Sequence, residues 1–309
     1  MPSTYPRTAK PALIIGSVAI DRIATSVTRT GDILGGAATY ASIAASYFAP
    51  AQLLGVVGAD FPKRFIQRLR KHGVDLRGLR VDPAGKTFFW SGRYGENFDR
   101  CENLVTELNV LETFSPKIPA EYRDSRYIML GAITPALQCQ VMDQVPRDAF
   151  VLADTRDFWI ELTRPDLERL IRRVDLFVLN ENEAEALSGE KNLIVAGWNI
   201  RKMGPRIVIV KKGSHGSLLF HPDGFFALPA YPVARLVDPT GAGDSYAGAL
   251  IGYLASVNRT DLPALRRAIA YATACASLTV ESFGVNRLSA AGRSRIDLRY
   301  RDLAKFTRF

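Results

Sequence analysis

Short apolar segments and segments with helical spacing alternate along most of this 309-residue chain. After Pro116 the apolar runs have the length and composition of buried strands, and the segments between them have a period near 3.6 residues. The expected strands are Tyr127–Leu130, Phe150–Ala153, Leu176–Leu179, Ile207–Val210 and Ser217–Phe220. The expected helices are Asp166–Arg173, Glu183–Ser188, Ser245–Ala255 and Leu262–Val280. This alternation predicts an α/β fold with a doubly wound, mostly parallel sheet flanked by helices.

The N-terminal part begins with the same rhythm and then changes. Ala12–Ile20 and Gln52–Val57 are expected to be strands, and Gly36–Phe48 and Pro62–His72 are expected to be helices. Lys86–Tyr94 and Asn103–Glu112 both resemble strands, with no helix between them. Two consecutive strands predict a small antiparallel insertion at about 86–112. We therefore expect one domain over 1–309, with the segment 21–34 as a further candidate part of the insertion.

Charge and cysteine content narrow the functional classes. Lys+Arg 40 against Asp+Glu 31 gives a net charge of +9, which suits an anionic ligand. The arginines are densest near the C-terminus, where we interpret them as a solvated helix face rather than a nucleic-acid-binding tail. The three cysteines are scattered, and the chain has no apolar run of membrane-spanning length. The expectation is a cytoplasmic protein with a small-molecule substrate and no membrane partner.

The segment from Val237 to Leu250 carries the clearest chemical signal. Gly241, Ala242 and Gly243 are small enough for consecutive backbone amides to converge at the start of a helix, where an anion is favoured. Asp244 follows at the helix entrance, and the helix dipole is expected to keep it ionised. An amide nest beside a carboxylate suits phosphoryl transfer, with Asp244 as the general base. The alternative is a helix cap beside a tight glycine turn.

This segment also resembles a known signature. Asp238-Pro239-Thr240-Gly241-Ala242-Gly243-Asp244, followed by Gly248-Ala249-Leu250-Ile251, is similar to the second signature of the ribokinase-like (PfkB-type) carbohydrate kinases. The similarity continues in order along the chain. Further matches are Asp21, the di-glycine Gly35-Gly36, the turn Val57–Asp60, Asn180-Glu181-Asn182-Glu183 and the turn Lys211–Gly216.

The resemblance implies a ribokinase-like fold with a small β lid, and an ATP-dependent kinase that phosphorylates a hydroxyl of a sugar or sugar-like molecule. The 241–243 amides would hold the γ-phosphoryl group. On the nucleotide side it implies Asn180, Glu183, Lys211, Lys212, Gly213, Ser214 and Gly216, with Glu183 helping to place Mg²⁺ through water. On the acceptor side it implies Asp21, Gly35, Gly36 and Thr39, to which the lid adds Arg93 as a candidate, with the neighbouring Tyr94 as an alternative. Asp238, Thr240 and Gly284 would surround a monovalent cation such as K⁺.

Several of these residues have simpler interpretations. Asn180 and Glu183 have the spacing of a capping box, and capping can coexist with placing Mg²⁺. The di-glycine could serve close helix packing, and Lys211 and Lys212 could be solvated. The aromatic residues Phe88–Trp90 favour packing within the lid over base stacking.

The acceptor side departs from the family pattern. Where the family has GGxxxN, this chain has Thr39 at the asparagine position, or Tyr40 if the helix starts one residue later. The segment Leu130–Pro135 lacks the acidic sugar ligand that ribokinase carries, which argues against ribose. A nucleoside of the inosine or adenosine type, inositol, and a non-catalytic sugar- or nucleotide-binding regulator remain as alternatives. The lid aromatics also suggest a homodimer formed through the lid.

Overall fold

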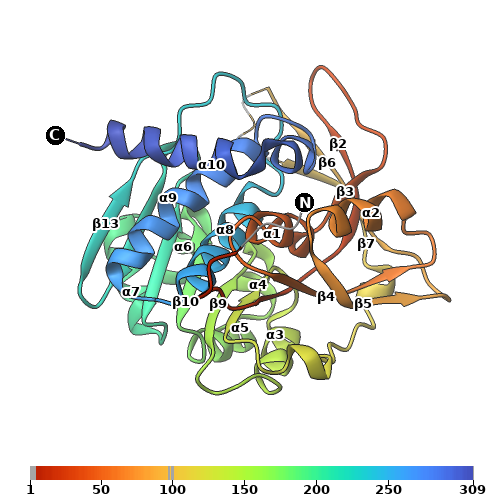
Figure 1. The fold of residues 1–309 in the computed structure, drawn as a ribbon, viewed down its shortest axis with the longest axis horizontal. Helices are drawn as coiled ribbons and strands as arrows, with labels where there is room; N and C mark the ends of the chain where they lie inside the picture. Colours follow the sequence, from red (N-terminus) through yellow and green to blue (C-terminus); the bar gives the residue numbers. More distant parts are fainter. Residues whose placement is uncertain (1–4, 97, 99–100, 309) are drawn as a thin grey trace.

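A nine-stranded sheet forms the centre of the molecule (Figure 1), in a computed structural model that describes residues 5–96, 98 and 101–308. The strand order is β13-β12-β11-β10-β9-β8-β1-β4-β5. All neighbouring strands are parallel except the β11/β12 and β12/β13 pairs. The bounds are β1 (Ala12–Ile15), β4 (Ala51–Gly58), β5 (Asp75–Asp82), β8 (Tyr127–Leu130), β9 (Phe150–Asp154), β10 (Leu176–Asn180), β11 (Ile207–Lys211), β12 (Ser217–His221) and β13 (Gly224–Leu228). The predicted doubly wound α/β fold is confirmed.

Helices cover both faces of this sheet because alternate strand residues point to opposite sides. Ile14 packs into one core while Leu13 and Ile15 pack into the other. The first core lies under α1 (Ala37–Ala45), α2 (Lys63–Lys71), α8 (Ala242–Val257), α9 (Leu262–Thr279) and α10 (Asn286–Phe306). The second lies under α3 (Pro135–Met142), α4 (Asp157–Leu162), α5 (Arg164–Ile171), α6 (Glu181–Ser188) and α7 (Leu193–Lys202). Among the described residues, no helix is long and apolar enough to cross a membrane.

Two glycines of α8 bring α1 against it. A Cβ on Gly248 would lie 2.2 Å from the carbonyl oxygen of Ala41, and a Cβ on Gly252 would lie 2.7 Å from the Cα of Ala45. Only a residue without a side chain permits this approach. The close packing places the start of α1, which follows Gly36, near the start of α8, which follows Gly241.

A second, small sheet lies at the β5 end of the molecule, opposite β13 (Figure 1). Its order is β3-β2-β6-β7, with the bounds β2 (Ala19–Ala24), β3 (Ile33–Gly35), β6 (Phe88–Tyr94) and β7 (Cys101–Glu107). The two hairpin pairs are antiparallel, but β2 and β6 run parallel, so the sheet is mixed rather than purely antiparallel. The reason is that β2 and β6 come from different parts of the chain and no hairpin joins them.

Two expected strands are divided differently. Ala12–Ile20 contains a break at Gly16–Val18, so β1 belongs to the large sheet and β2 to the small one. Ser17 explains the break, because its side chain and carbonyl accept hydrogen bonds from the amides of Ala37 and Ala38 at the start of α1. The expected strand Asn103–Glu112 ends at Glu107 and is followed by a 3₁₀ turn, η1 (Asn109–Leu111).

The arginines near the C-terminus are partly structural. Arg299 is buried and donates to both carboxylate oxygens of Glu281 at 2.8 Å and to Ser277 Oγ at 2.7 Å. The guanidinium of Arg293 lies 4.5 Å from the centre of the Phe48 ring. The interpretation of this segment as a solvated helix face is therefore wrong for Arg299, which is buried, whereas Arg293 is exposed as expected and also contacts the Phe48 ring.

Candidate active site

The turn before α8 has the shape that its sequence predicts. Gly241 is the N-cap of α8 with φ 75°, and a Cβ there would lie 2.4 Å from ring atoms of Tyr40. Position 241 therefore requires glycine for two reasons: the positive φ, and the Tyr40 ring that occupies the space of a side chain. The Ala242 amide donates to the Pro239 carbonyl at 3.2 Å, so it must share or exchange that bond to bind an anion. The first turn of the helix provides the other amides.

Asp244 lies in the first turn of α8 and its pKa is raised to about 6. Burial is the main cause, the Asp154 carboxylate adds to it, and the positive charges of Lys211 and Arg156 oppose it. Burial thus opposes the ionisation that the helix dipole is expected to favour. A pKa near 6 leaves Asp244 mostly ionised at pH 7 and suits a general base.

Lys211, at the end of β11, lies against this turn. Its ammonium Nζ would be 3.0 Å from a Cβ on Gly243, and it forms an ion pair with Asp154 at 3.2 Å. Both side chains are largely buried, with exposed fractions of 17% and 6%. Burial lowers the pKa of Lys211, but the carboxylates of Asp154, Glu183 and Asp244 outweigh it and raise that pKa overall. The alternative of a solvated strand-end lysine is wrong for Lys211.

Sequence reasoning missed Asp154 and Arg156, which follow one another closely at the end of β9. Asp154 is held in place by Gln138 of α3, whose side-chain amide donates to the Asp154 carbonyl at 3.0 Å and to the carbonyls of Leu130 and Gly131. Arg156 is exposed, and its positive charge lowers the pKa of Asp244, Glu183 and Asp21. The available signal was a run of charged residues directly after a buried strand.

Asn180 and Glu183 form the capping box that their spacing predicts. The Glu183 amide donates to Asn180 Oδ1 at 2.9 Å, and the Asn180 amide donates to Glu183 Oε2 at 2.7 Å. Burial raises the pKa of Glu183 to about 7, and the nearby Lys211 charge opposes this shift. One carboxylate oxygen of Glu183 is occupied by the cap, so a single oxygen is left for a metal-bound water.

The turn from Lys212 to Gly216 joins β11 to β12. The Lys212 amide donates to the Gly216 carbonyl at 2.7 Å, and the 3₁₀ turn η3 (Gly213–His215) lies between them. Gly216 has φ 88°, and a Cβ there would lie 2.0 Å from the Leu228 carbonyl oxygen. A residue with a side chain therefore cannot replace glycine at this position of the turn. Gly213 and Ser214 are exposed at the same edge of the sheet as Lys211.

Asp21 and the di-glycine are in direct contact. A Cβ on Gly35 would lie 1.9 Å from Asp21 Oδ2, so the carboxylate occupies the space that the glycine leaves. Gly36 has φ 91° and caps α1, and a Cβ there would be 2.5 Å from the Ser17 carbonyl. Burial raises the pKa of Asp21 to about 8, and the Asp238 and Asp244 carboxylates add to the shift, while a backbone hydrogen bond from Gly36 opposes it. The three carboxylates therefore lie near one another.

Tyr40 is the second group that sequence reasoning did not assign firmly. Its side chain is 1% exposed, and its hydroxyl has no hydrogen-bond partner among the residues described. Burial raises its pKa well above the ordinary value, and the nearby carboxylates of Asp21, Asp238 and Asp244 add to this. Thr39 is also fully buried, with a hydroxyl that lacks a partner in the same described ranges.

The small sheet contributes Tyr94 rather than Arg93. The Tyr94 hydroxyl lies 3.0 Å from Thr240 Oγ1, directly before the glycine turn. Arg93 is on the opposite face of β6, where it lies 3.5 Å from Glu102 on β7. The structure does not bring Arg93 into the site, because successive strand residues face opposite sides.

Asp238 is fully buried beneath this turn. Its carboxylate accepts from the Thr240 amide at 2.9 Å and from the Gly284 amide at 3.4 Å. Burial raises its pKa, and in the part of the chain that the structure describes no lysine or arginine forms an ion pair with it. A buried carboxylate that accepts hydrogen bonds from Thr240 and Gly284 is compatible with the expected monovalent cation.

Comparison with known proteins decides the family. The model of the pfkB family carbohydrate kinases matches residues 121–291. The cytidine kinase of Thermococcus kodakarensis is 31% identical over 258 residues, covering 80% of this chain and 88% of that protein. The chain belongs to the PfkB family. This PfkB-family protein is thus a kinase, a phosphotransferase with an alcohol group as acceptor, and the resemblance inferred from the signature motifs is confirmed.

Solved structures share the fold of this PfkB-family kinase at lower identity. The Burkholderia thailandensis nucleoside kinase in complex with inosine has a TM-score of 0.79 at 21% identity, covering 94% of this chain and 96% of that one. A ribokinase II from Escherichia coli, solved with ATP and Mg²⁺, has a TM-score of 0.79 at 22% identity, covering 95% and 99%. These likenesses establish the ribokinase-like fold.

Proposed function

We propose that this PfkB-family kinase transfers the γ-phosphoryl group of ATP to a hydroxyl of a nucleoside. The observation that supports phosphoryl transfer is the convergence of the 241–243 turn, the Asp244 carboxylate and the Lys211 ammonium at one point. The nucleoside is favoured by the 31% identity to a cytidine kinase over 80% of the chain. An acceptor of the free-sugar type, which the signature motifs alone suggest, is the second candidate.

In the proposed reaction the acceptor hydroxyl oxygen forms a bond to the γ-phosphorus, and the bond between that phosphorus and the β,γ-bridging oxygen breaks. ADP leaves with the electron pair of that bond, and the hydroxyl proton passes to the Asp244 carboxylate. Lys211 and the free amides of the glycine turn neutralise charge on the transferred group. The transition state is loose, so positioning and charge neutralisation supply most of the acceleration and a base of pKa about 6 is sufficient.

Mg²⁺ fits the oxygen donors on the nucleotide side. Asp154 and Glu183 would hold the ion through water, because Mg²⁺ prefers carboxylate oxygens and keeps several of its water ligands. Among the described residues, no group of three or more acidic, histidine or cysteine side chains is arranged to bind a metal directly. When bound, Mg²⁺ supplies charge neutralisation between the phosphates. Asn180 and the turn containing Lys212, Gly213, Ser214 and Gly216 would bind the nucleotide at the same sheet edge. K⁺ at Asp238 would neutralise that carboxylate.

The acceptor side has features suited to a nucleoside. Asp21 pairs in register with Trp90 across the β2/β6 pair, so the two residues share one face of the small sheet. The Trp90 indole lies over Gly92, where a Cβ would be 2.4 Å from its ring. We assign Asp21, Gly35 and Gly36 to sugar hydroxyls, Tyr40 and Thr39 to further polar contacts, and the Trp90 ring to stacking on the base.

The small sheet would then act as a lid that excludes water from the transfer, with Tyr94 as its contact to the catalytic turn. Its edge strand β7 is exposed along its whole length, including Leu104 and Val105. We propose that a second copy covers this edge in a homodimer. The three free cysteines suit a cytoplasmic location.

The test measures ADP release from Mg-ATP with cytidine, inosine, adenosine, ribose, fructose and myo-inositol. Turnover with a nucleoside and loss of at least ~100-fold in Asp244→Asn would support the proposal. Asp148→Asn, which removes an exposed carboxylate, is the matched control and should retain activity. Turnover with a free sugar alone would select the second candidate. ATP binding without turnover on any acceptor would favour the non-catalytic regulator.

A further inference from the structure

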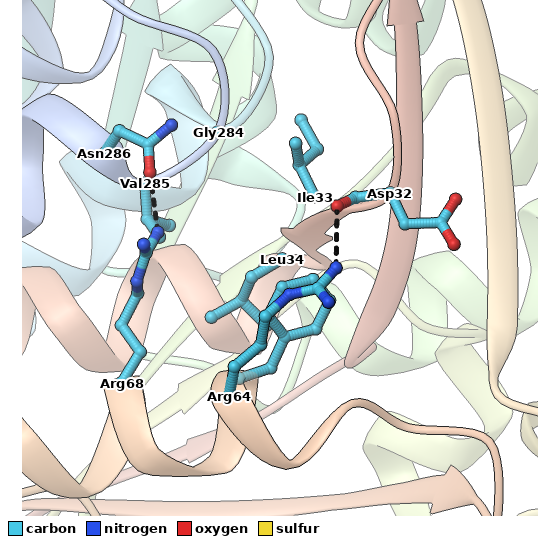
Figure 2. A pocket seen from close by; sticks show the side chains of 9 residues that line it. Asp32, Ile33, Leu34, Arg64, Arg68, Gly284, Val285 and Asn286 are labelled. Carbon is cyan, nitrogen blue, oxygen red and sulfur yellow. Dashed lines mark hydrogen bonds between the residues drawn. The ribbon is translucent and has the colours of Figure 1, made fainter.

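A small cavity lies beside the catalytic centre, between α2, β3 and the segment that follows α9 (Figure 2), and its lining shares Gly284 with the surroundings of Asp238. Its volume is about 190 Å³. Arg64 and Arg68 of α2 supply two guanidinium groups, and Leu34, Phe65 and Val285 supply apolar surface. The cavity thus combines positive charge with an apolar wall. Neither arginine has a role in the proposed phosphoryl transfer.

The two guanidinium groups have donors to spare. Arg68 Nη1 donates to Asn286 Oδ1 at 2.6 Å, and Arg64 Nη2 makes one long contact of 3.4 Å with the Asp32 carbonyl oxygen. A guanidinium carries five N–H donors, so most of them remain free on each side chain. The Arg64 plane is supported by the Phe65 ring, whose centre is 4.9 Å away, which favours one orientation of the fork.

No acidic side chain neutralises this pair. Asp32 lines the cavity, but its carboxylate forms an ion pair with Arg22 at 2.5 Å, and Figure 2 shows it directed away from Arg64. Within residues 5–96, 98 and 101–308, no carboxylate oxygen lies within ion-pair distance of Arg64 or Arg68. Two guanidinium groups beside one cavity repel each other, and an anion between them relieves that repulsion.

We propose that this cavity is a binding site for a small phosphate-bearing anion. The planar fork of arginine matches the oxygens of a phosphate group, and two forks can hold one phosphate from two sides. The volume is below the ~300 Å³ at which drug-sized ligand pockets begin, which favours a ligand smaller than a nucleotide. The apolar wall leaves room for a short organic group beyond the phosphate.

The test is isothermal titration of the full chain, saturated with Mg²⁺ and a non-hydrolysable ATP analogue so that the γ-phosphoryl site is filled. Inorganic phosphate and glycerol 3-phosphate are titrated separately. Both should bind to the wild type, and Arg68→Ala should weaken their affinity roughly tenfold or more. Arg64→Lys keeps the charge but loses the fork and should give an intermediate affinity.

Arg70→Ala is the matched control, because Arg70 lies on the same helix, is exposed and does not line the cavity. Its affinity should change less than ~2-fold, as expected for screened charge at a distance. Tighter binding of glycerol 3-phosphate than of phosphate would identify the apolar wall as part of the site, and equal affinities would identify inorganic phosphate as sufficient. Absence of binding to the wild type, or equal weakening in Arg68→Ala and Arg70→Ala, would overturn the proposal.

Discussion

At the scale of single residues, the protonation of Asp244 should set the acid limb of the rate. Burial raises its pKa to about 6, and a general base must be ionised. We expect kcat/KM to rise with pH and to reach half of its plateau near pH 6. Arg156 lowers this pKa, so Arg156→Ala should move the limb to higher pH. The measurement is a pH profile, with the exposed Arg147→Ala as control. A limb at the same pH in both variants would contradict the assignment.

The raised pKa of Asp21 should make the folded protein less stable as the pH rises. Its pKa is raised from 3.8 to about 8 in the folded protein, so between these values the folded state holds a proton that the unfolded state releases. Stability from this group is present at low pH and is lost as pH rises through about 8. Asp21→Asn should therefore raise the Tm at pH 8 by a few °C, and by less at pH 5. Scanning calorimetry checks this, and an equal shift at both pH values would count against it.

Variants of the buried pair Lys211 and Asp154 allow effects on catalysis and on stability to be measured separately. Lys211→Met leaves Asp154 buried without its partner, which should cost about 3–5 kcal/mol of unfolding free energy and reduce kcat ~100-fold or more. The double variant Lys211→Met/Asp154→Asn should recover stability but not kcat. Urea unfolding and turnover are measured together, with the exposed Lys191→Met as control. Recovery of kcat in the double variant would show that neither Lys211 nor Asp154 acts on the phosphates or their Mg²⁺.

Single residues also show where the sequence is informative. Gly241, Asp244, Asn180 and Glu183 were found because each belongs to a local pattern of turn or cap. Asp154 was missed because its partner Lys211 is 57 residues away, and no local pattern encodes that contact. Arg93 was named as the candidate in preference to Tyr94, because strand alternation shows only that the two side chains lie on opposite faces. It does not show which of the two faces borders the site.

At the scale of elements, the contact between β6 and the catalytic turn should control water access. Tyr94→Phe removes the hydroxyl that lies 3.0 Å from Thr240 Oγ1. The small sheet should then open more readily, so ATP hydrolysis without acceptor should rise several-fold and the KM for acceptor should increase. Tyr231→Phe is the matched control, because its hydroxyl bonds to Asp302 at 3.3 Å on α10. Unchanged hydrolysis in Tyr94→Phe would show that this contact does not hold the sheet closed.

Elements with strong periodicity were predicted closely, and the failures have physical causes. Tyr127–Leu130 matches β8 because a fully buried parallel strand is apolar at every position. The strand β5 was missed because it is an edge strand whose charged residues alternate with glycine and leucine. The break between β1 and β2 is fixed by Ser17 capping α1, a contact between segments that periodicity cannot show.

At the scale of the whole molecule, the order of the strands in the large sheet brings the residues of the site together. The carboxyl ends of β9, β10 and β11 deliver Asp154, Asn180 and Lys211 to one edge, where the starts of α8 and α1 also lie. The sequence predicted this edge from the parallel α/β pattern. It could not predict the acceptor, because the lid pairing that places Trp90 beside Asp21 joins strands from separate parts of the chain.

If K⁺ binds at Asp238 as proposed, this convergence should make the site sensitive to that cation. Asp238 is fully buried and contacts both the Thr240 and Gly284 amides, so it joins the catalytic turn to the segment after α9. An unneutralised carboxylate there repels the phosphates and helps to raise the pKa of Asp21. Replacing K⁺ by choline should therefore lower kcat/KM roughly tenfold, a magnitude typical of lost support around a charged site. Asp238→Asn removes the charge and should lose the K⁺ response while keeping partial activity. Equal rates of the wild type in K⁺ and in choline would show that the Gly284 and Thr240 amides alone stabilise this carboxylate.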